Sequence, residues 1–273
     1  MAEDPDSHTM PLLDHLMELR NRLIWTLLAF LCTFFLCFYF AQPIYGFLVR
    51  PLAEVMLEVG GTNRMIYTAL TEAFFTQIKV GFFAAAFVSF PVIASQLWLF
   101  IAPGLYKHEK GALAPFLVAS PVLFLAGASF VYYFIMPMAW RFLLQFQTGA
   151  DESVLPIELE ARVGEYLGLV MKLILAFGIS FQMPVLLVLL ARVGIVSADG
   201  LVEKRKYAIV GVFVFAAIVT PPDVISQIGL AVPMMILYEI SIYACRIIER
   251  KREEAWAEDA EDDEFEDTDF NEA

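Results

Sequence analysis

Residues 80–110 have the sequence VGFFAAAFVSFPVIASQLWLFIAPGLYKHEK. The part from Val80 to Tyr106 carries no charged side chain, and it is long enough to cross the roughly 30 Å hydrocarbon layer of a membrane, which takes about 20 helical residues. Aromatic side chains lie near its end, Ala102-Pro103-Gly104 should break the helix, and Lys107 to Lys110 are polar. This change predicts a membrane helix that ends at a water-exposed recognition surface, rather than at a buried catalytic centre.

The composition also indicates a membrane protein. Of the 273 residues, 59% are hydrophobic and 18% are charged, which the surface of a soluble domain of this length would not tolerate. The net charge of -13 comes mostly from residues 253–273, which hold twelve acidic and no basic side chains, and the rest of the chain is nearly neutral. We therefore expect a transmembrane domain over residues 1–252 and an acidic, disordered tail over residues 253–273.

Long apolar runs predict an all-α polytopic fold with six transmembrane helices. They lie at about residues 23–43, 74–102, 113–137, 164–191, 207–220 and 224–245. An amphipathic helix that begins near Pro11 should precede the first of them. The fifth is only about 21 Å long at about 1.5 Å per residue, so it should thin the membrane or be sheltered by protein. Prolines inside the other spans predict a kinked and curved arrangement.

Basic residues predict the orientation of these helices. Six spans place both termini on one side, and the segments on that side hold twelve Lys or Arg residues against four on the other. An excess of positive charge marks the cytoplasmic side. Both termini and the Lys107–Lys110 segment should therefore be cytoplasmic, whereas the longer loops, around residues 43–73 and 138–164, should face outward.

The residue sets that membrane enzymes need are missing from the sequence. Its three histidines, His8, His15 and His108, all lie outside the predicted spans, and neither a Gly-rich phosphate loop nor a serine-nucleophile motif is present. The three cysteines have no metal-binding spacing. We expect no enzyme activity, no metal or other cofactor, and no nucleic-acid partner.

Polar groups inside or near the spans leave other classes of function open. Lys79, Gln182 and Glu239 could serve a secondary transporter of a small solute, because intramembrane polar groups usually mark function. Lys79 and Glu239 lie near the ends of their spans, where long side chains reach the interface, and only Gln182 lies well inside. A transporter would need a midplane cavity that joins the three groups. A purely structural scaffold for other membrane subunits is a third alternative.

Two carboxylates at the predicted cytoplasmic edge, Glu18 and Glu109, are candidates for a binding site. A partly shielded carboxylate suits a guanidinium, which offers a planar bidentate fork, so two carboxylates could bind two arginines. The alternatives are local. Glu18 and Arg22 are spaced as an exposed i, i+4 salt bridge, and Glu109 could pair with Lys107 or Lys110.

Longer motifs occur in a fixed order among the predicted spans. They are HLMELRNRL (residues 15–23), VRPL (49–52), FFTQIKV (74–80), WLFIAPGLYKHEK (98–110), FGISFQMPV (177–185) and TPPDVISQ (220–227). Together they resemble the TatC family, the membrane receptor of the twin-arginine protein translocase, over residues 11–250. One such motif alone would be weak evidence, whereas six in order are specific.

The resemblance implies a receptor in the bacterial inner membrane that binds signal peptides with paired arginines. With TatA- and TatB-like single-span partners it would export folded proteins by using the proton motive force, in contact with membrane lipid and with further copies of itself. By this resemblance the signal-peptide site falls on Glu18, Arg20, Phe100, Lys107 and Glu109, and the translocation or partner-contact positions are Pro51, Gln182, Asp223 and Gln227. The family often has Glu where this chain has Gln182, which forms hydrogen bonds but does not titrate.

Overall fold

The computed structural model describes residues 12–59, 64–101, 114–147, 159–220 and 223–271. Within these ranges the regular elements are all helical, and the one β feature is an isolated pairing of Ile66 with Arg162. The helices are α1 (Leu12–Tyr39), α2 (Ala41–Val59), α3 (Glu72–Ile101), α4 (Ala114–Phe130), the π-helix η4 (Val131–Ile135), α5 (Met136–Leu144), α6 (Val163–Ser180), α7 (Met183–Arg192), α8 (Ala198–Glu203), α9 (Arg205–Val219) and α10 (Val224–Asn271).

Five helical segments in the described residues are long and apolar enough to cross a membrane. They are Leu16–Tyr39, Glu72–Phe100, Pro115–Leu144, Val163–Arg192 and Val224–Arg250. Helix α9 has 15 residues, about 22 Å at about 1.5 Å per residue, so it is shorter than the hydrocarbon layer. The all-helical, multi-pass fold is confirmed, with five helices of spanning length where the sequence predicts six spans.

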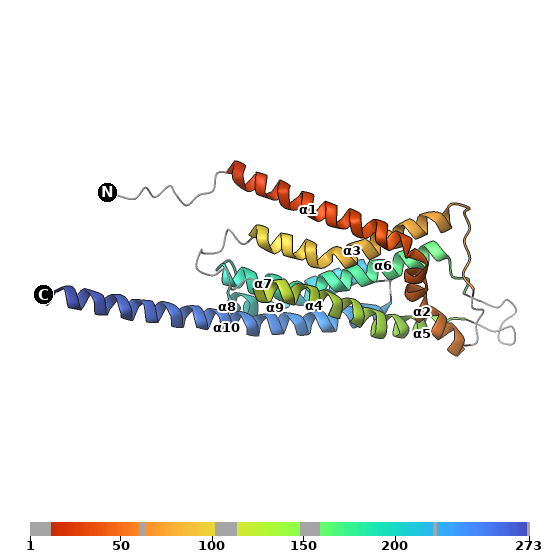
Figure 1. The fold of residues 1–273 in the computed structure, drawn as a ribbon. Coiled ribbons are helices and arrows are strands. Elements are labelled where there is room, and N and C mark those ends of the chain that lie inside the picture. Colours follow the sequence, from red (N-terminus) through yellow and green to blue (C-terminus); the bar gives the residue numbers. More distant parts are fainter. Residues whose placement is uncertain (1–11, 60–63, 102–113, 148–158, 221–222, 272–273) are drawn as a thin grey trace.

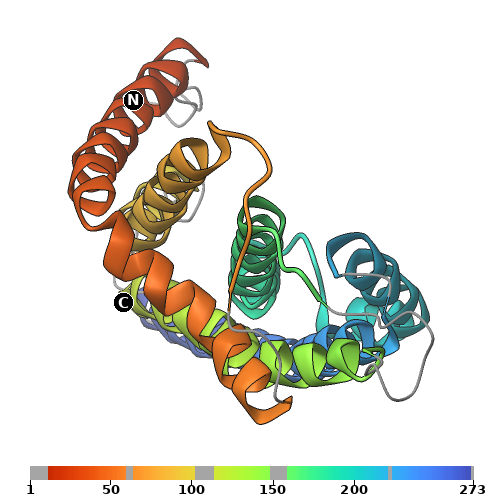
Figure 2. The same ribbon diagram turned by 90° about the vertical axis from the view of Figure 1, so that its right-hand side faces the viewer.

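The long helices lie side by side, with the start of α1 and the end of α10 at the same end of the bundle (Figure 1). Helix α2 is the exception, because it lies across the bundle at the opposite end. Seen along the bundle, the helices follow a bent path that begins at α1 and ends at α9, with α6 inside the bend (Figure 2). The arrangement is thus open on one side rather than a closed ring.

Several predicted boundaries differ from the structure. The segment 43–73, expected to be a loop, contains most of α2, and α5 continues to Leu144 inside the second expected loop. Pro43 lies in the first turn of α2, where a missing N–H costs little, and Pro51 lies in its interior, which made this helix resemble a loop in sequence. The predicted amphipathic helix is continuous with the first span, as one helix α1.

Two of the predicted spans contain local interruptions. The third is composed of α4, the π-helix η4 and α5, and a π-helix is one recognised cause of a bend. The fourth consists of α6 and α7, with a turn at Phe181-Gln182 between them. Pro184 follows directly after this turn, in the first turn of α7, where proline is compatible with a new helix.

The acidic end of the chain is helical where the sequence predicts disorder. Helix α10 has 48 residues and continues to Asn271. Residues 253–271 are rich in Glu and Ala, which are strong helix formers, and they extend a helix that is already nucleated in the bundle, so the cost of starting a helix does not arise.

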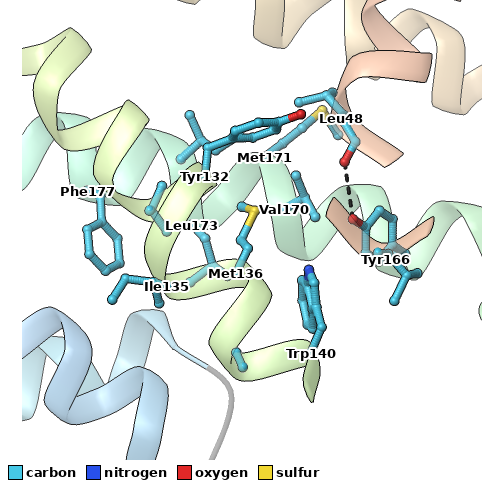
Figure 3. Packing of buried hydrophobic residues seen from close by; sticks show 14 of the residues in the cluster. Leu48, Tyr132, Ile135, Met136, Trp140, Tyr166, Val170, Met171, Leu173 and Phe177 are labelled. Atoms are coloured by element: carbon cyan, nitrogen blue, oxygen red, sulfur yellow. Dashed lines mark hydrogen bonds between the residues drawn. The ribbon is translucent and has the colours of Figure 1, made fainter. Parts of the chain in front are cut away.

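The main core lies between α2, η4, α5 and α6 (Figure 3). Val131, Met136, Leu167 and Val170 have no exposed surface there. The Tyr166 hydroxyl donates a hydrogen bond of 3.1 Å to the backbone carbonyl of Leu48. The cross-lying helix α2 is therefore fixed to the long helices by apolar packing and by a buried hydrogen bond.

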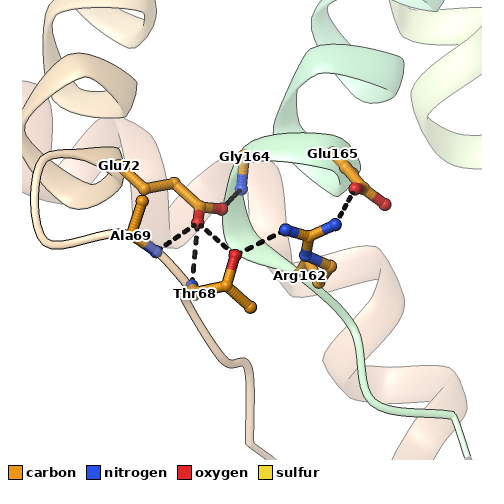
Figure 4. A network of polar contacts seen from close by, with 6 residues as sticks. All are labelled: Thr68, Ala69, Glu72, Arg162, Gly164 and Glu165. Carbon is orange, nitrogen blue, oxygen red and sulfur yellow. Dashed lines mark hydrogen bonds and ion pairs between the residues drawn. The ribbon is translucent and has the colours of Figure 1, made fainter.

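A polar network on the α2 side of the bundle joins α3 to α6 (Figure 4). Glu72, the first residue of α3, accepts hydrogen bonds from the backbone N–H of Thr68 at 2.9 Å and of Gly164 at 3.0 Å. Gly164 lies in the first turn of α6, so one carboxylate serves the beginnings of two helices. Arg162 adds bonds to the Thr68 hydroxyl and to Glu165.

Candidate recognition surface at the ends of α1 and α3

The N-terminal part of α1 lies against the C-terminal part of α3, at the end of the bundle where α1 begins and α10 ends (Figure 1). Arg22 on α1 connects the two helices. It donates from Nε to Glu18 Oε1 at 3.0 Å and also bonds the same oxygen through Nη2. Its Nη1 donates to Gln96 Oε1 on α3, at a long 3.4 Å. Gln96, near the end of α3, is thus placed beside the Glu18–Arg22 pair.

The predicted Glu18–Arg22 salt bridge is present, but it is more buried than expected. The two side chains are only 24% and 23% exposed, so the pair is partly shielded from water by the α1–α3 contact. Both bonds from Arg22 end on Oε1, and neither uses Oε2. A carboxylate has about four lone-pair sites on its two oxygens, so Glu18 retains capacity for a second guanidinium.

The other signal-peptide positions are placed less fully. Arg20 is exposed, and its guanidinium donates to Asn21 Oδ1 at 3.5 Å, a weak contact. Phe100 is half-buried near the end of α3. Lys107 and Glu109 lie outside the described residues, as does the predicted break at residues 102–104. The structure therefore brings Glu18 and Arg22 to the end of α3 from which the segment 102–113 continues.

A buried hydrogen-bonded chain below this surface was missed in the sequence. Trp98 Nε1 on α3 donates to Ser120 Oγ on α4 at 2.7 Å, and Gln182 Nε2, in the turn between α6 and α7, donates to the Ser120 carbonyl at 2.9 Å. We call these three residues the Trp98–Ser120–Gln182 chain. The only sign of this chain in the sequence is a serine before Pro121 in an apolar run. This sign is weak, because the hydrogen-bond partners of Ser120 depend on how three helices pack.

The remaining predicted positions lie at the opposite end of the bundle. Pro51 is buried in α2. Asp223 precedes α10 and caps it, because its Oδ1 accepts from the backbone N–H of Ser226 at 2.6 Å. Among the described residues, Asp223 Oδ2 and Ser226 Oγ have no hydrogen-bond partner although both atoms are buried. Gln227 is half-buried and donates to the Phe213 carbonyl of α9 at 3.4 Å. These positions form a second group, separate from Glu18.

The three polar groups that a solute transporter would use do not meet. Gln182 is bonded to Ser120, Glu239 Oε2 accepts from Arg205 at 2.7 Å near the start of α9, and Lys79 is an exposed residue in the first third of α3. An apolar cavity in the described part of the chain is lined by none of them. The geometry therefore gives no support to the transporter.

Within the described residues, a multi-pass helical fold with a partly shielded ion pair at one end, and with the candidate transporter groups apart from one another, fits a membrane receptor or docking subunit better than a solute carrier. The family model described as "Sec-independent protein translocase protein (TatC)" matches residues 14–233. The chain belongs to this TatC family, whose members are non-enzymatic translocase subunits.

Individual relatives agree with this assignment. The chain is 52% identical over 252 residues to the Sec-independent protein translocase protein TatC of Magnetococcus marinus, which covers 92% of this chain and 90% of the relative. It is 42% identical over 238 residues to the TatC of Escherichia coli K12, covering 87% and 89% of the two chains. A crystal structure of the twin-arginine translocase receptor TatC matches with a TM-score of 0.73 and 39% identity, over 86% of this chain and 99% of that one. The resemblance inferred from the motifs is confirmed.

Proposed function

We propose that the chain is the signal-peptide receptor and core subunit of a twin-arginine translocase in a bacterial inner membrane. Both termini would lie in the cytoplasm, α9 would be the fifth and shortest of six spans, and the proton motive force would drive export of folded cargo. The observation that carries the receptor role is the contact of Arg22 with both Glu18 and Gln96. It fixes a partly shielded carboxylate beside the end of α3.

We assign the paired arginines of the signal peptide to two carboxylates, Glu18 and Glu109. The first arginine would bind the Oε2 side of Glu18, opposite the oxygen that Arg22 occupies. The second would bind Glu109, eight residues beyond the end of α3. A charge-assisted bidentate pair is the geometry that distinguishes arginine from lysine. The other proposed contacts of the signal peptide are Arg20, Phe100 and Lys107.

Peptide binding tests this assignment. A twin-arginine peptide should bind the full chain in detergent, and a twin-lysine peptide should bind at least about tenfold more weakly, since loss of a partly buried charged contact costs about 2 kcal/mol or more. Glu109→Lys and Glu18→Gln should each reduce binding, whereas Glu18→Asp should be tolerated better. Glu203→Lys, an exposed carboxylate in α8 at the same end of the bundle, is the matched control. Full crosslinking of the peptide to Glu109→Lys would contradict the assignment.

We further propose that TatA- and TatB-like single-span partners, and further copies of this chain, contact the side of the bundle formed by α9 and the start of α10. Support comes from the length of α9, 15 residues with three of them buried, which leaves most of a short apolar helix uncovered. Pro51, Gln182, Asp223 and Gln227 are the proposed translocation or partner-contact positions. Lengthening α9 by four residues, about one turn, should weaken the partner complex on native gels, and an unchanged complex would contradict this role.

A further inference from the structure

An apolar cavity of about 300 Å³ lies on the α2 side of the bundle. Its walls come from the end of α1, the start of α2, and from α3, α4, η4 and α6. Val88 on α3 and Leu125 on α4 line it and are 54% and 50% exposed. Because both side chains belong to membrane-spanning segments, the cavity opens sideways toward the hydrocarbon of the membrane.

Helix α2 forms the rim of this cavity. Phe47 lines the cavity and stacks on Tyr132 with ring centroids 4.3 Å apart, and the Tyr132 hydroxyl donates to the Phe47 carbonyl at 2.7 Å. Arg50 follows one helical turn after Phe47, on the same side of α2. Hydrogen bonding to Glu54 and its charge raise the pKa of Arg50 above its usual value, and Tyr132 and Tyr133 add smaller contributions in the same direction. Its spacing from Phe47 therefore places Arg50 one turn further along α2 from the cavity wall.

The lining and the neighbouring charges favour a lipid chain as the occupant. The cavity walls are mainly apolar, and the charged pair Arg50 and Glu54 follows within two helical turns of Phe47 on α2. An apolar chain joined to a charged headgroup is the chemistry of a phospholipid. A single acyl chain can enter from the side between Val88 and Leu125. Filling such an apolar cavity with hydrocarbon also restores the dispersion contacts that an empty one lacks.

The rim specifies the headgroup. Arg50 donates from Nε to Glu54 Oε1 at 2.7 Å, a bond that uses one of the five guanidinium N–H donors and one of the two carboxylate oxygens. Both side chains are well exposed, at 70% and 59%. The terminal nitrogens of Arg50 suit a phosphate, and Glu54 Oε2 suits an ammonium group. A neutral ion pair is complementary to a headgroup that is itself a neutral ion pair.

We propose that the cavity and the Arg50–Glu54 pair bind one phospholipid with a zwitterionic phosphate–ammonium headgroup. One acyl chain occupies the cavity, the phosphate contacts Arg50 and the ammonium contacts Glu54. The site belongs to the membrane leaflet on the α2 side, at the opposite end of the bundle from Glu18, so it is independent of signal-peptide binding.

Lipid titration of the full chain tests the proposal. The delipidated protein in detergent is titrated with phosphatidylethanolamine or with phosphatidylglycerol of the same acyl chains, and bound lipid is counted by native mass spectrometry. We expect one tightly bound phosphatidylethanolamine molecule. Phosphatidylglycerol should bind with an affinity at least about tenfold lower, because it loses one charged contact. Val88→Trp should fill the cavity and abolish the tight binding. Val118→Trp, on an exposed position of α4 outside the cavity, should leave it unchanged.

Further variants separate the chain from the headgroup. Leu125→Trp fills the cavity from the opposite wall and replaces Val88→Trp if that variant does not fold. Arg50→Gln should weaken the binding of phosphatidylethanolamine by about tenfold. Glu54→Gln should reduce the preference of the protein for phosphatidylethanolamine over phosphatidylglycerol. Equal binding of the two lipids by the unmodified protein would overturn the headgroup assignment. Tight binding retained in both tryptophan variants would overturn the cavity assignment.

Discussion

Removing the Ser120 hydroxyl should destabilise the bundle by leaving Trp98 without a hydrogen-bond partner. The two side chains are buried, Ser120 with no exposed surface and Trp98 with 5%, and the Nε1–Oγ distance of 2.7 Å indicates a well-formed bond. An unsatisfied buried donor costs about 1–3 kcal/mol. For hydrogen bonds between membrane helices, double-mutant cycles give coupling free energies of about 0.6 kcal/mol on average, with a maximum near 1.7 kcal/mol. We expect Ser120→Ala to lower the free energy of unfolding by about 1.5 kcal/mol.

A double-mutant cycle isolates this hydrogen bond from the loss of packing. Ser120→Ala, Trp98→Phe and the double variant are unfolded reversibly in mixed micelles, with helix content followed by circular dichroism. The double variant should cost about 1 kcal/mol less than the sum of the single variants, because each single variant already breaks the same bond. Ser95→Ala, whose hydroxyl bonds within its own helix α3 at 2.8 Å, is the control and should change stability little.

Additivity would refute the reasoning. Independent sites add within about 0.3–0.5 kcal/mol, so a smaller coupling would mean that the contact contributes nothing of its own. The variants also test a link to recognition, since Trp98 lies two residues before Phe100 on α3. If the Trp98–Ser120–Gln182 chain positions the end of α3, Ser120→Ala should weaken twin-arginine peptide binding at a temperature where the protein remains folded.

Three further variants test packing, charge and helix termination. A Cβ at Gly178 would lie 2.6 Å from the Phe124 ring, well inside the 3.5–4.0 Å of a normal contact, so Gly178→Ala should lower the free energy of unfolding by about 1–3 kcal/mol. Hydrogen bonding to Arg141 lowers the pKa of Glu58. The pair therefore stabilises the fold fully above the unfolded-state pKa of about 4.3, and this stabilisation is lost as the pH falls through the lower pKa of the folded state. Glu58→Gln should flatten the acid side of a plot of melting temperature against pH. Lys172→Met should remove the α6 side chain that donates to the Ile218 carbonyl in the last turn of α9, and amide hydrogen exchange in that turn should become faster.

The spans were predictable from sequence because they are forced by one strong requirement. A helix that crosses hydrocarbon needs about 20 apolar residues, and few other structures tolerate such runs. Helix α2 escaped this reasoning because it lies across the bundle and not through it. With Arg50, Glu54 and Glu58 on one side and buried apolar residues on the other, it is an amphipathic helix. Its two prolines pointed to a loop.

The candidate site was predictable only in its local part. The Glu18–Arg22 pair follows from i, i+4 spacing on a helix, and the structure contains it. The contact of Arg22 with Gln96 depends on the relative position of α1 and α3, which spacing within one helix does not specify. The same holds for Gln182, which the sequence placed inside a span without indicating that its donor would bind the Ser120 carbonyl.

Backbone carbonyls that lack a helical partner explain two of the ties between helices in this fold. In an α-helix the N–H of residue i bonds the carbonyl of residue i−4, and proline has no N–H. Pro51 therefore frees the Phe47 carbonyl, which accepts the Tyr132 hydroxyl at 2.7 Å. The Ile218 carbonyl lies in the last turn of α9, where the final carbonyls of a helix have no partner within the helix, and it accepts from Lys172 Nζ at 2.9 Å.

These bonds give Pro51 and the end of α9 a role in joining neighbouring helices. An unsatisfied carbonyl costs several kcal/mol in hydrocarbon, so a freed carbonyl selects for a donor on a neighbouring helix and fixes how closely that helix approaches. Tyr132 ties η4 to α2 in this way, and Lys172 ties α6 to the short α9. In α2 the sequence identifies which carbonyl is freed, because that depends on the position of the proline alone. Which helix supplies the donor is decided by the packing of the whole bundle, and for this reason only the structure reveals the second half of each tie.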